Sequence, residues 1–158
     1  MARLVFEDNY GVYWATSVAA INAPTGAEIV AAEDITDFIP KDGFNPGASN
    51  NTVDVGHLGT AYDATEIGSY GHNLSVTMFK DDEDDDAWDL FPRGARGFLI
   101  VSPFSRVPGS GDPVYVWKCA AQEPTLPSTA ANTRQSFTVE FAVQDADMRA
   151  VVDGSATP

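Results

Sequence analysis

The sequence predicts a mostly β fold, an antiparallel β-sandwich or partial barrel with one short flanking α-helix. Segments rich in β-branched and aromatic residues recur along the chain, and the clearest of them alternate apolar and polar side chains as half-buried strands do. Only one segment, at about 82–91, has the pattern of a helix. A length of 158 residues and a hydrophobic content of 44% suit a globular chain, and we expect a single domain over 1–158.

Six segments have the strand pattern. In the clearest one, 136–144, a single face would hold Phe137, Val139, Phe141 and Val143. The other predicted strands are 10–18, 62–67, 71–80, 97–102 and 114–121. A glycine- and proline-containing connection at 108–113 is typical of a hairpin turn between the last two of these five.

The predicted helix begins in an acidic run, where carboxylates complement the positive end of the helix dipole. Pro92 and Gly94 mark its end. The residues expected to pack this helix on the sheet are Ala87, Trp88, Leu90 and Phe91.

Between the first and second predicted strands, prolines and glycines interrupt every short apolar piece, so we expect a long loop at about 42–59. Loops of this length inside a compact domain are usually functional or disordered, and this one is too apolar for a solvated tether. We therefore expect it to dock on a neighbouring copy of the chain, through Phe44, Asn45, Val53, Val55 and His57. A C-terminal arm is expected at about 145–158.

The chain is strongly acidic, with 23 Asp and Glu against nine Lys and Arg and a formal net charge of −14. Such a charge repels nucleic acid and leaves no basic stripe to bind it. No apolar run is long enough for a membrane helix, and the first residues lack the features of a signal peptide, so we expect no membrane association and assembly in a cytoplasm.

No catalytic or metal-binding motif is present. The acidic run lacks the glycine and glutamate that a calcium-binding EF-hand loop needs at its sixth and twelfth positions. His57, His72 and Cys119 lack zinc-ligand spacing, and Cys119 reads as a buried thiol in a strand. We therefore expect a chain without cofactor, metal or catalytic residues, and a structural protein rather than an enzyme.

The order of these features resembles the tail tube proteins, or major tail proteins, of long-tailed, siphovirus-type phages with actinobacterial hosts. The segments that carry the resemblance are 10–18, 33–44, 68–91 and 97–104. It implies a β-sandwich with a flanking helix, assembled into hexameric rings that stack into a tube. In such tubes the segments corresponding to 42–59 and to the C-terminal arm reach the next ring or the neighbouring subunit.

The resemblance also implies a location in the virion tail, assembly in the host bacterial cytoplasm, and several partners. These are other copies of the chain, a tape measure protein, a tail terminator and tail tip or baseplate proteins, with double-stranded DNA only in transit through the lumen. An acidic lumen would keep DNA from sticking to the wall. The candidate lumen-facing residues are Asp54, Asp63 and Glu66, and each could equally be an ordinary solvated acid.

Two alternatives stay open at this point. One is a capsid decoration or head–tail connector protein, which would also be β-rich and self-associating. The other, from a different class, is a carbohydrate-binding β-sandwich module that uses Trp14, Trp88 and Trp117 to stack on sugars.

Overall fold

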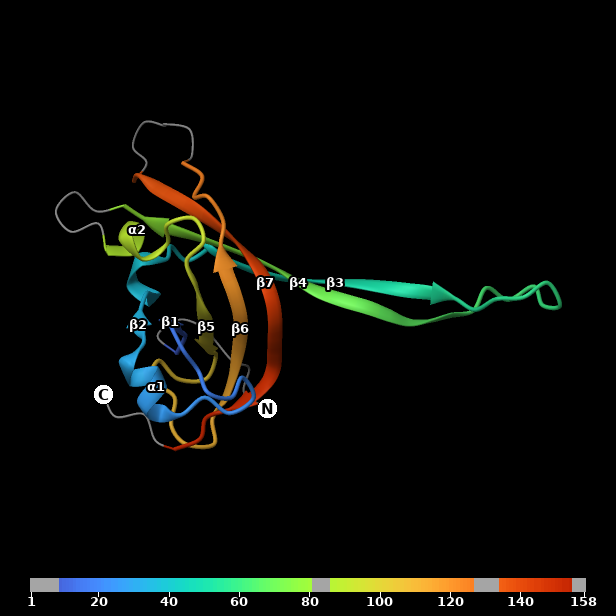
Figure 1. Cartoon of the computed structure of the whole chain (residues 1–158), viewed down its shortest axis with the longest axis horizontal. Coiled ribbons are helices and arrows are strands. Elements are labelled where there is room, and N and C mark those ends of the chain that lie inside the picture. The colour runs from blue at the N-terminus through green and yellow to red at the C-terminus, as the bar shows by residue number, and fades with distance from the viewer. Residues whose placement is uncertain (1–8, 81–85, 127–133, 155–158) are drawn as a thin grey trace.

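The computed structural model describes residues 9–80, 86–126 and 134–154. These residues form seven strands, two short α-helices and one 3₁₀ turn (Figure 1). In chain order the elements are β1 (Gly11–Ala15), α1 (Gly26–Ala31), β2 (Glu33–Asp34), η1 (Thr36–Phe38), β3 (Phe44–Asp54), β4 (Thr65–Phe79), α2 (Asp86–Leu90), β5 (Arg96–Ser102), β6 (Pro113–Ala121) and β7 (Ser136–Val151).

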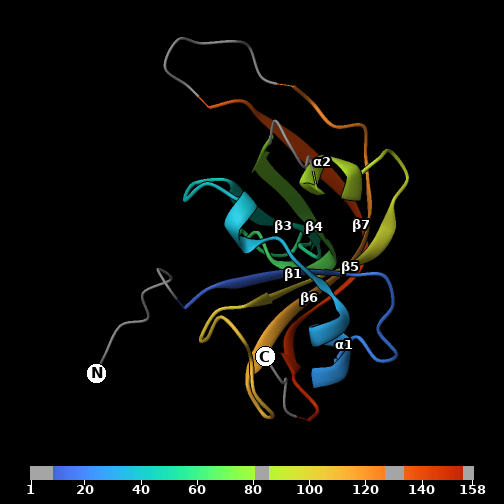
Figure 2. The ribbon, with the colours of Figure 1, turned by 90° about the vertical axis from the view of Figure 1, so that its left-hand side faces the viewer.

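The seven strands form one sheet in the order β2-β1-β5-β6-β7-β4-β3, and every neighbouring pair is antiparallel. The predicted mostly β, antiparallel fold with a short flanking helix is therefore confirmed. The sheet is not closed, because β2 at one edge and β3 at the other do not pair with each other. Helices α1 and α2 lie at opposite ends of this body (Figures 1 and 2).

Apolar residues are buried on both faces of the sheet, as the alternation along β1 shows. Val12 and Trp14 belong to a larger core cluster, whereas Tyr13 and Ala15 belong to a smaller one. Ala87 of α2 lies in the larger cluster and Ile29 of α1 in the smaller. Each helix therefore covers its own face of the sheet.

The prediction of a long loop at 42–59 is wrong, because most of this segment forms the 11-residue strand β3. Its sequence, FNPGASNNTVD, is rich in the residues that favour turns, and all of it after Phe44 is exposed on both faces, so no apolar alternation marks it. Pro46 is tolerated because β3 is an edge strand. The segment is a strand because it pairs with β4, and not because its own residues favour β structure.

Other boundaries also differ from the sequence-based expectation. The strands expected at 62–67 and 71–80 form one strand, β4. Residues 145–151 are not an arm, since β7 continues through Val151 beside β6, and 155–158 lie outside the described residues. The predicted helix at 82–91 is α2 at Asp86–Leu90, and 82–85 also lie outside the described residues. Helix α1 was not predicted.

Candidate assembly surface

The most prominent feature of the molecule is a long β-hairpin that leaves the body, and we call residues 48–72 the arm (Figure 1). Strands β3 and β4 pair from Phe44↔Val76 out to Asp54↔Thr65. Strand β4 pairs with β7 only from Asn73 onward, so the arm is a two-stranded ribbon beyond that point. A ribbon of two strands is marginally stable in water without further packing.

A β-bulge in the arm decides which side chains share a face. Asn50 pairs with Tyr70, but two residues further along β3 Thr52 pairs with Ile67, so β4 contains one extra residue there. Gly68 lies in this bulge, where a Cβ would stand 2.9 Å from the carbonyl oxygen of Asn51. The bulge therefore brings Ile67 to the same face as Tyr70.

The two faces of the arm differ in chemistry. The core-side face continues the row of buried Val76 and Leu74 outward, and from the body to the bulge region it holds Ala48, Asn50, Thr52, Ile67, Tyr70 and His72. Ile67 is 95% exposed and Tyr70 is 73% exposed, with the Tyr70 ring 6.1 Å from that of His72. From the body to the bulge the opposite face holds short polar residues and glycine, Ser49, Asn51, Ser69 and Gly71, and beyond the bulge it holds Val53 and Glu66.

Two observations support this assignment of the opposite face. The amide nitrogen Nδ2 of Asn51 donates a hydrogen bond to Oγ of Ser69 at 3.0 Å. A Cβ placed on Gly71 would meet Oγ of Ser49 at 3.3 Å. Side chains from both strands therefore meet on this side of the ribbon.

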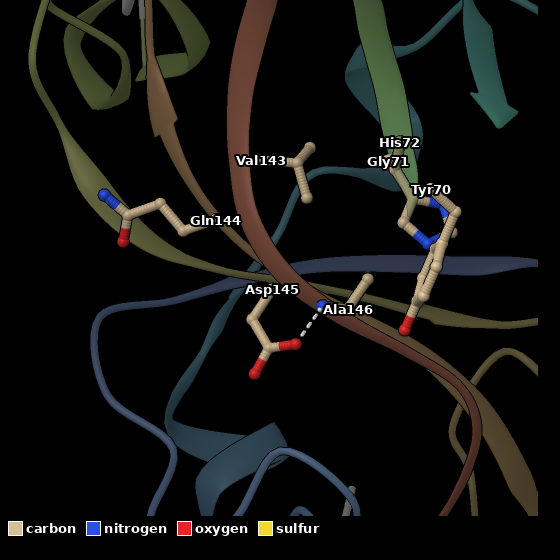
Figure 3. Close-up of a pocket in the computed structure, with 7 residues that line it drawn as sticks. All are labelled: Tyr70, Gly71, His72, Val143, Gln144, Asp145 and Ala146. Carbon is tan, nitrogen blue, oxygen red and sulfur yellow. Dashed lines mark hydrogen bonds between the residues drawn. The ribbon is translucent and has the colours of Figure 1, made fainter. Parts of the chain in front are cut away.

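A shallow cleft of about 180 Å³ lies where the arm leaves the body, between Tyr70, Gly71 and His72 of β4 and residues 143–146 of β7 (Figure 3). Val143 and Ala146 also pack against the larger core cluster. Figure 3 shows Gln144 turned away from β4, and Oδ1 of Asp145 accepts a hydrogen bond from the Ala146 amide at 2.9 Å. The cleft thus joins the core-side face of the arm to the edge of the core.

The residues expected to dock on a neighbouring copy lie at different places along the hairpin. Phe44 is at its base, half-buried, with its ring 6.0 Å from Trp117 in the core. Asn45 and Val53 are exposed on β3, on the face opposite the core, and Val55 continues the pairing toward the tip through its amide and the Ala64 carbonyl. The tip residue His57 accepts a hydrogen bond at Nδ1 from the Gly59 amide. Ile67 and Tyr70 were not singled out from the sequence.

The three acids considered for the lumen are exposed in the outer part of the hairpin. Asp54 is at the outer end of the core-side face, where its Oδ1 accepts a hydrogen bond from the Gly56 amide at 2.9 Å. Glu66 pairs with Val53 on the opposite face, and Asp63 lies in the tip. A single subunit therefore does not bring these carboxylates together on one face.

The short helix α2 and the turn after it pack on the sheet. Ala87 and Phe91 are buried in the larger core cluster, and Trp88 and Leu90 pack against it. The Trp88 ring lies 5.0 Å from that of Phe137, with Nζ of Lys80 4.1 Å above it. Trp14 and Trp117 are buried, so neither offers a surface on which a sugar could stack.

The described residues contain no group of three or more His, Cys, Asp or Glu placed to hold a metal ion. Burial raises the pKa of the Cys119 thiol to about 12, which suits a packed side chain and not a nucleophile. Among the same residues, no helix is long and apolar enough to span a membrane.

Several solved structures have a similar fold. The chain is similar to a protein of the anti-feeding prophage baseplate, with a TM-score of 0.59 and 12% identity over 96% of this chain and 99% of that one. It is similar to a chain in the tail of an empty GTA particle refined with C6 symmetry, with a TM-score of 0.57 and 15% identity over 94% and 100% of the two chains. The SPP1 tail tube gives a TM-score of 0.56 and 10% identity, over 94% of this chain and 81% of that one.

Comparison of sequences identifies the family of the chain, whereas the solved structures show only its fold. A search of curated protein sequences found no match to the chain. Residues 2–152, however, match the sequence profile of the family described as "Phage tail tube protein". This match covers nearly the whole chain and agrees with the structural likeness to chains of the GTA tail and of the SPP1 tail tube. The chain belongs to the phage tail tube protein family.

Proposed function

We propose that this chain is the repeating structural subunit of a phage tail tube, in which hexameric rings stack around a lumen that conducts double-stranded DNA during ejection. The observation that carries the proposal is the family match over residues 2–152. A structural role follows from the family, and the subunit would be located in the tail of the virion.

The open edges of the sheet support assembly with other copies. The outer edge of β3 has no partner strand in the described chain, and the same is true of the β4-facing side of β7 beyond Ala142. Exposed edges invite pairing with another chain, and closure of a sheet into a barrel removes them. A ring of copies that pair edge to edge would give such a barrel.

The arm supports contact between copies. It extends a marginally stable ribbon away from the body and exposes large apolar side chains over its whole length, among them Val53, Val55, Leu58, Tyr62, Ile67 and Tyr70. Docking on a neighbouring subunit or on the next ring would bury part of this apolar surface. Within the proposal, the arm is the ring-stacking element.

The charge of −14 supports transit of DNA without binding. A wall with excess carboxylates repels phosphates and releases the genome at each ring. Asp54, Asp63 and Glu66 remain candidates for this wall, and Glu140 of β7 adds an exposed acid on the face of the sheet opposite the larger core, across from Ser75.

Negative-stain electron microscopy with mass determination over a wide concentration range tests the proposal. Rings or hollow tubes are expected, either unaided or after addition of a tail tip initiator complex. A matched variant replaces residues 48–72 with an Asn-Gly turn and keeps all β4–β7 pairs. This variant should fold as a monomer and form no tubes. Trimers, or a single ring that never stacks, would favour a decoration or connector protein and overturn the tube assignment.

A further inference from the structure

We propose that the arm docks on a second copy of this chain through its core-side face, centred on Ile67 and Tyr70, and leaves the Asn, Ser and Gly face uncovered. This inference rests on the proposed tube and goes beyond it, because it assigns the docking face. It follows from three observations on the arm: the bulge, the distribution of charge and the continuity with the core.

The bulge at Gly68 gives one face an apolar pair that a regular hairpin would divide. Without the extra residue in β4, Gly68 would pair with Thr52 and Ile67 would lie on the opposite face from Tyr70. With it, Ile67 and Tyr70 lie on one face and are 95% and 73% exposed. Bulges of this kind redirect a side chain and are maintained at functional edges.

The distribution of charge allows another copy of this acidic chain to approach the core-side face. Two chains that each carry −14 repel one another, so contact is favoured where neither contributes a carboxylate. Residues 43–79 contain no Lys or Arg, and their only acids are Asp54, Asp63 and Glu66, all near the tip. Between Ala48 and Thr52 the core-side face has no acid, and Asp54 lies only at its outer end, so an equally acidic copy can approach the face on the body side of Asp54.

The core-side face is also continuous with buried apolar surface. Along β4 it runs outward from Val76 and Leu74, both buried, to His72 at the cleft and then to Tyr70. Val143 and Ala146 on the far side of the cleft pack against the same core. A second copy that covered this face would extend the core outward along the arm. The opposite face offers no comparable apolar side chain between the body and Ser69.

Two variants of β4 test the two faces of the arm one at a time, and each variant adds one negative charge. Ile67→Asp puts a carboxylate on the core-side face, and Ser69→Asp puts one on the opposite face two residues away. Both positions are exposed, so both variants should have the urea midpoint and circular dichroism spectrum of the wild-type monomer. Asp at position 69 can still accept the hydrogen bond from Asn51.

The readout is the critical concentration for tube formation, measured by sedimentation and electron microscopy. Because docking would bury Ile67, Ile67→Asp should raise the critical concentration at least tenfold, whereas Ser69→Asp should change it less than threefold. Ile67→Leu should assemble within threefold of wild type. Equal effects of the two Asp variants, or a larger effect of Ser69→Asp, would overturn the assignment of the face while the tube remained. Absence of tubes from the wild-type chain under every condition would overturn the proposed function and this inference with it.

Discussion

Phe91 is the side chain whose removal should damage the body most clearly. It lies directly after α2, is fully buried, and its ring is 5.0 Å from that of Trp14 and 5.6 Å from that of Phe141. Truncation of a buried phenylalanine to alanine costs about 3–5 kcal/mol, because the transfer free energy is lost and a cavity remains. Since a domain has a total stability of about 5–15 kcal/mol, Phe91→Ala should leave a marginal fold.

Urea unfolding followed by tryptophan fluorescence measures this loss, because Trp14 contacts the Phe91 ring. With a urea dependence of about 2 kcal/mol per molar, the midpoint should fall by about 2 M. Phe104→Ala removes the same atoms from a side chain that is 51% exposed and should cost less than about 1 kcal/mol. If the two variants lost equal stability, the packing of α2 on the sheet through Phe91 would be refuted.

Three further predictions concern α1, Cys119 and pH. Thr25→Ala removes the Oγ1 acceptor for the Glu28 amide, at 3.1 Å, and should lower the free energy of unfolding by about 1 kcal/mol in thermal melts, with no loss if the cap is absent in solution. Burial favours the neutral carboxyl of Glu28, but hydrogen bonds from the Thr25 and Ala19 amides outweigh burial and lower the pKa of Glu28 below 4.5. The stabilisation by the ionised carboxylate is therefore present above pH 4.5 and is lost as the pH falls through the pKa of the folded state. The stability advantage of wild type over Glu28→Gln should shrink in that range. Because burial raises the Cys119 pKa from 9.0 to about 12, its thiolate fraction at pH 8 is about a thousandfold lower than that of an ordinary thiol, and labelling of the native protein should be slower than in urea by at least a hundredfold.

The sequence predicted the body well wherever strands are half-buried. In β7, Phe137, Val139 and Phe141 alternate with polar residues, and all three are buried as expected. The sequence does contain a signal for helix α1, because Thr25 and Glu28 have the spacing of a capping box and the structure forms both of its hydrogen bonds. Its six residues are too few to show helical periodicity, so only the cap could have revealed it.

The arm could not have been predicted in the same way, because nothing within one subunit buries it. Alternation appears in a strand only where one face is removed from water, and β3 after Phe44 is exposed on both faces. Its Pro, Gly, Asn and Ser residues then read as turn residues. The strand exists because β4 pairs with it over residues far apart in sequence, and such pairing is invisible to local propensity.

Because of the bulge, the sequence pattern also fails to predict which side chains of β4 share a face. Counting back along β4 from buried Leu74 with a period of two places His72, Tyr70 and Gly68 on one face and assigns Ile67 to the other. The extra residue between Tyr70 and Ile67 reverses that assignment, and only the register of the hairpin reveals it. A sequence pattern therefore identifies the faces that a subunit buries by itself, whereas the face proposed for contact between copies depends on one glycine that shifts the register. Substitution of Gly68 by a residue with a Cβ, which would meet the Asn51 carbonyl oxygen at 2.9 Å, should disturb tube assembly more than it disturbs the stability of the monomer.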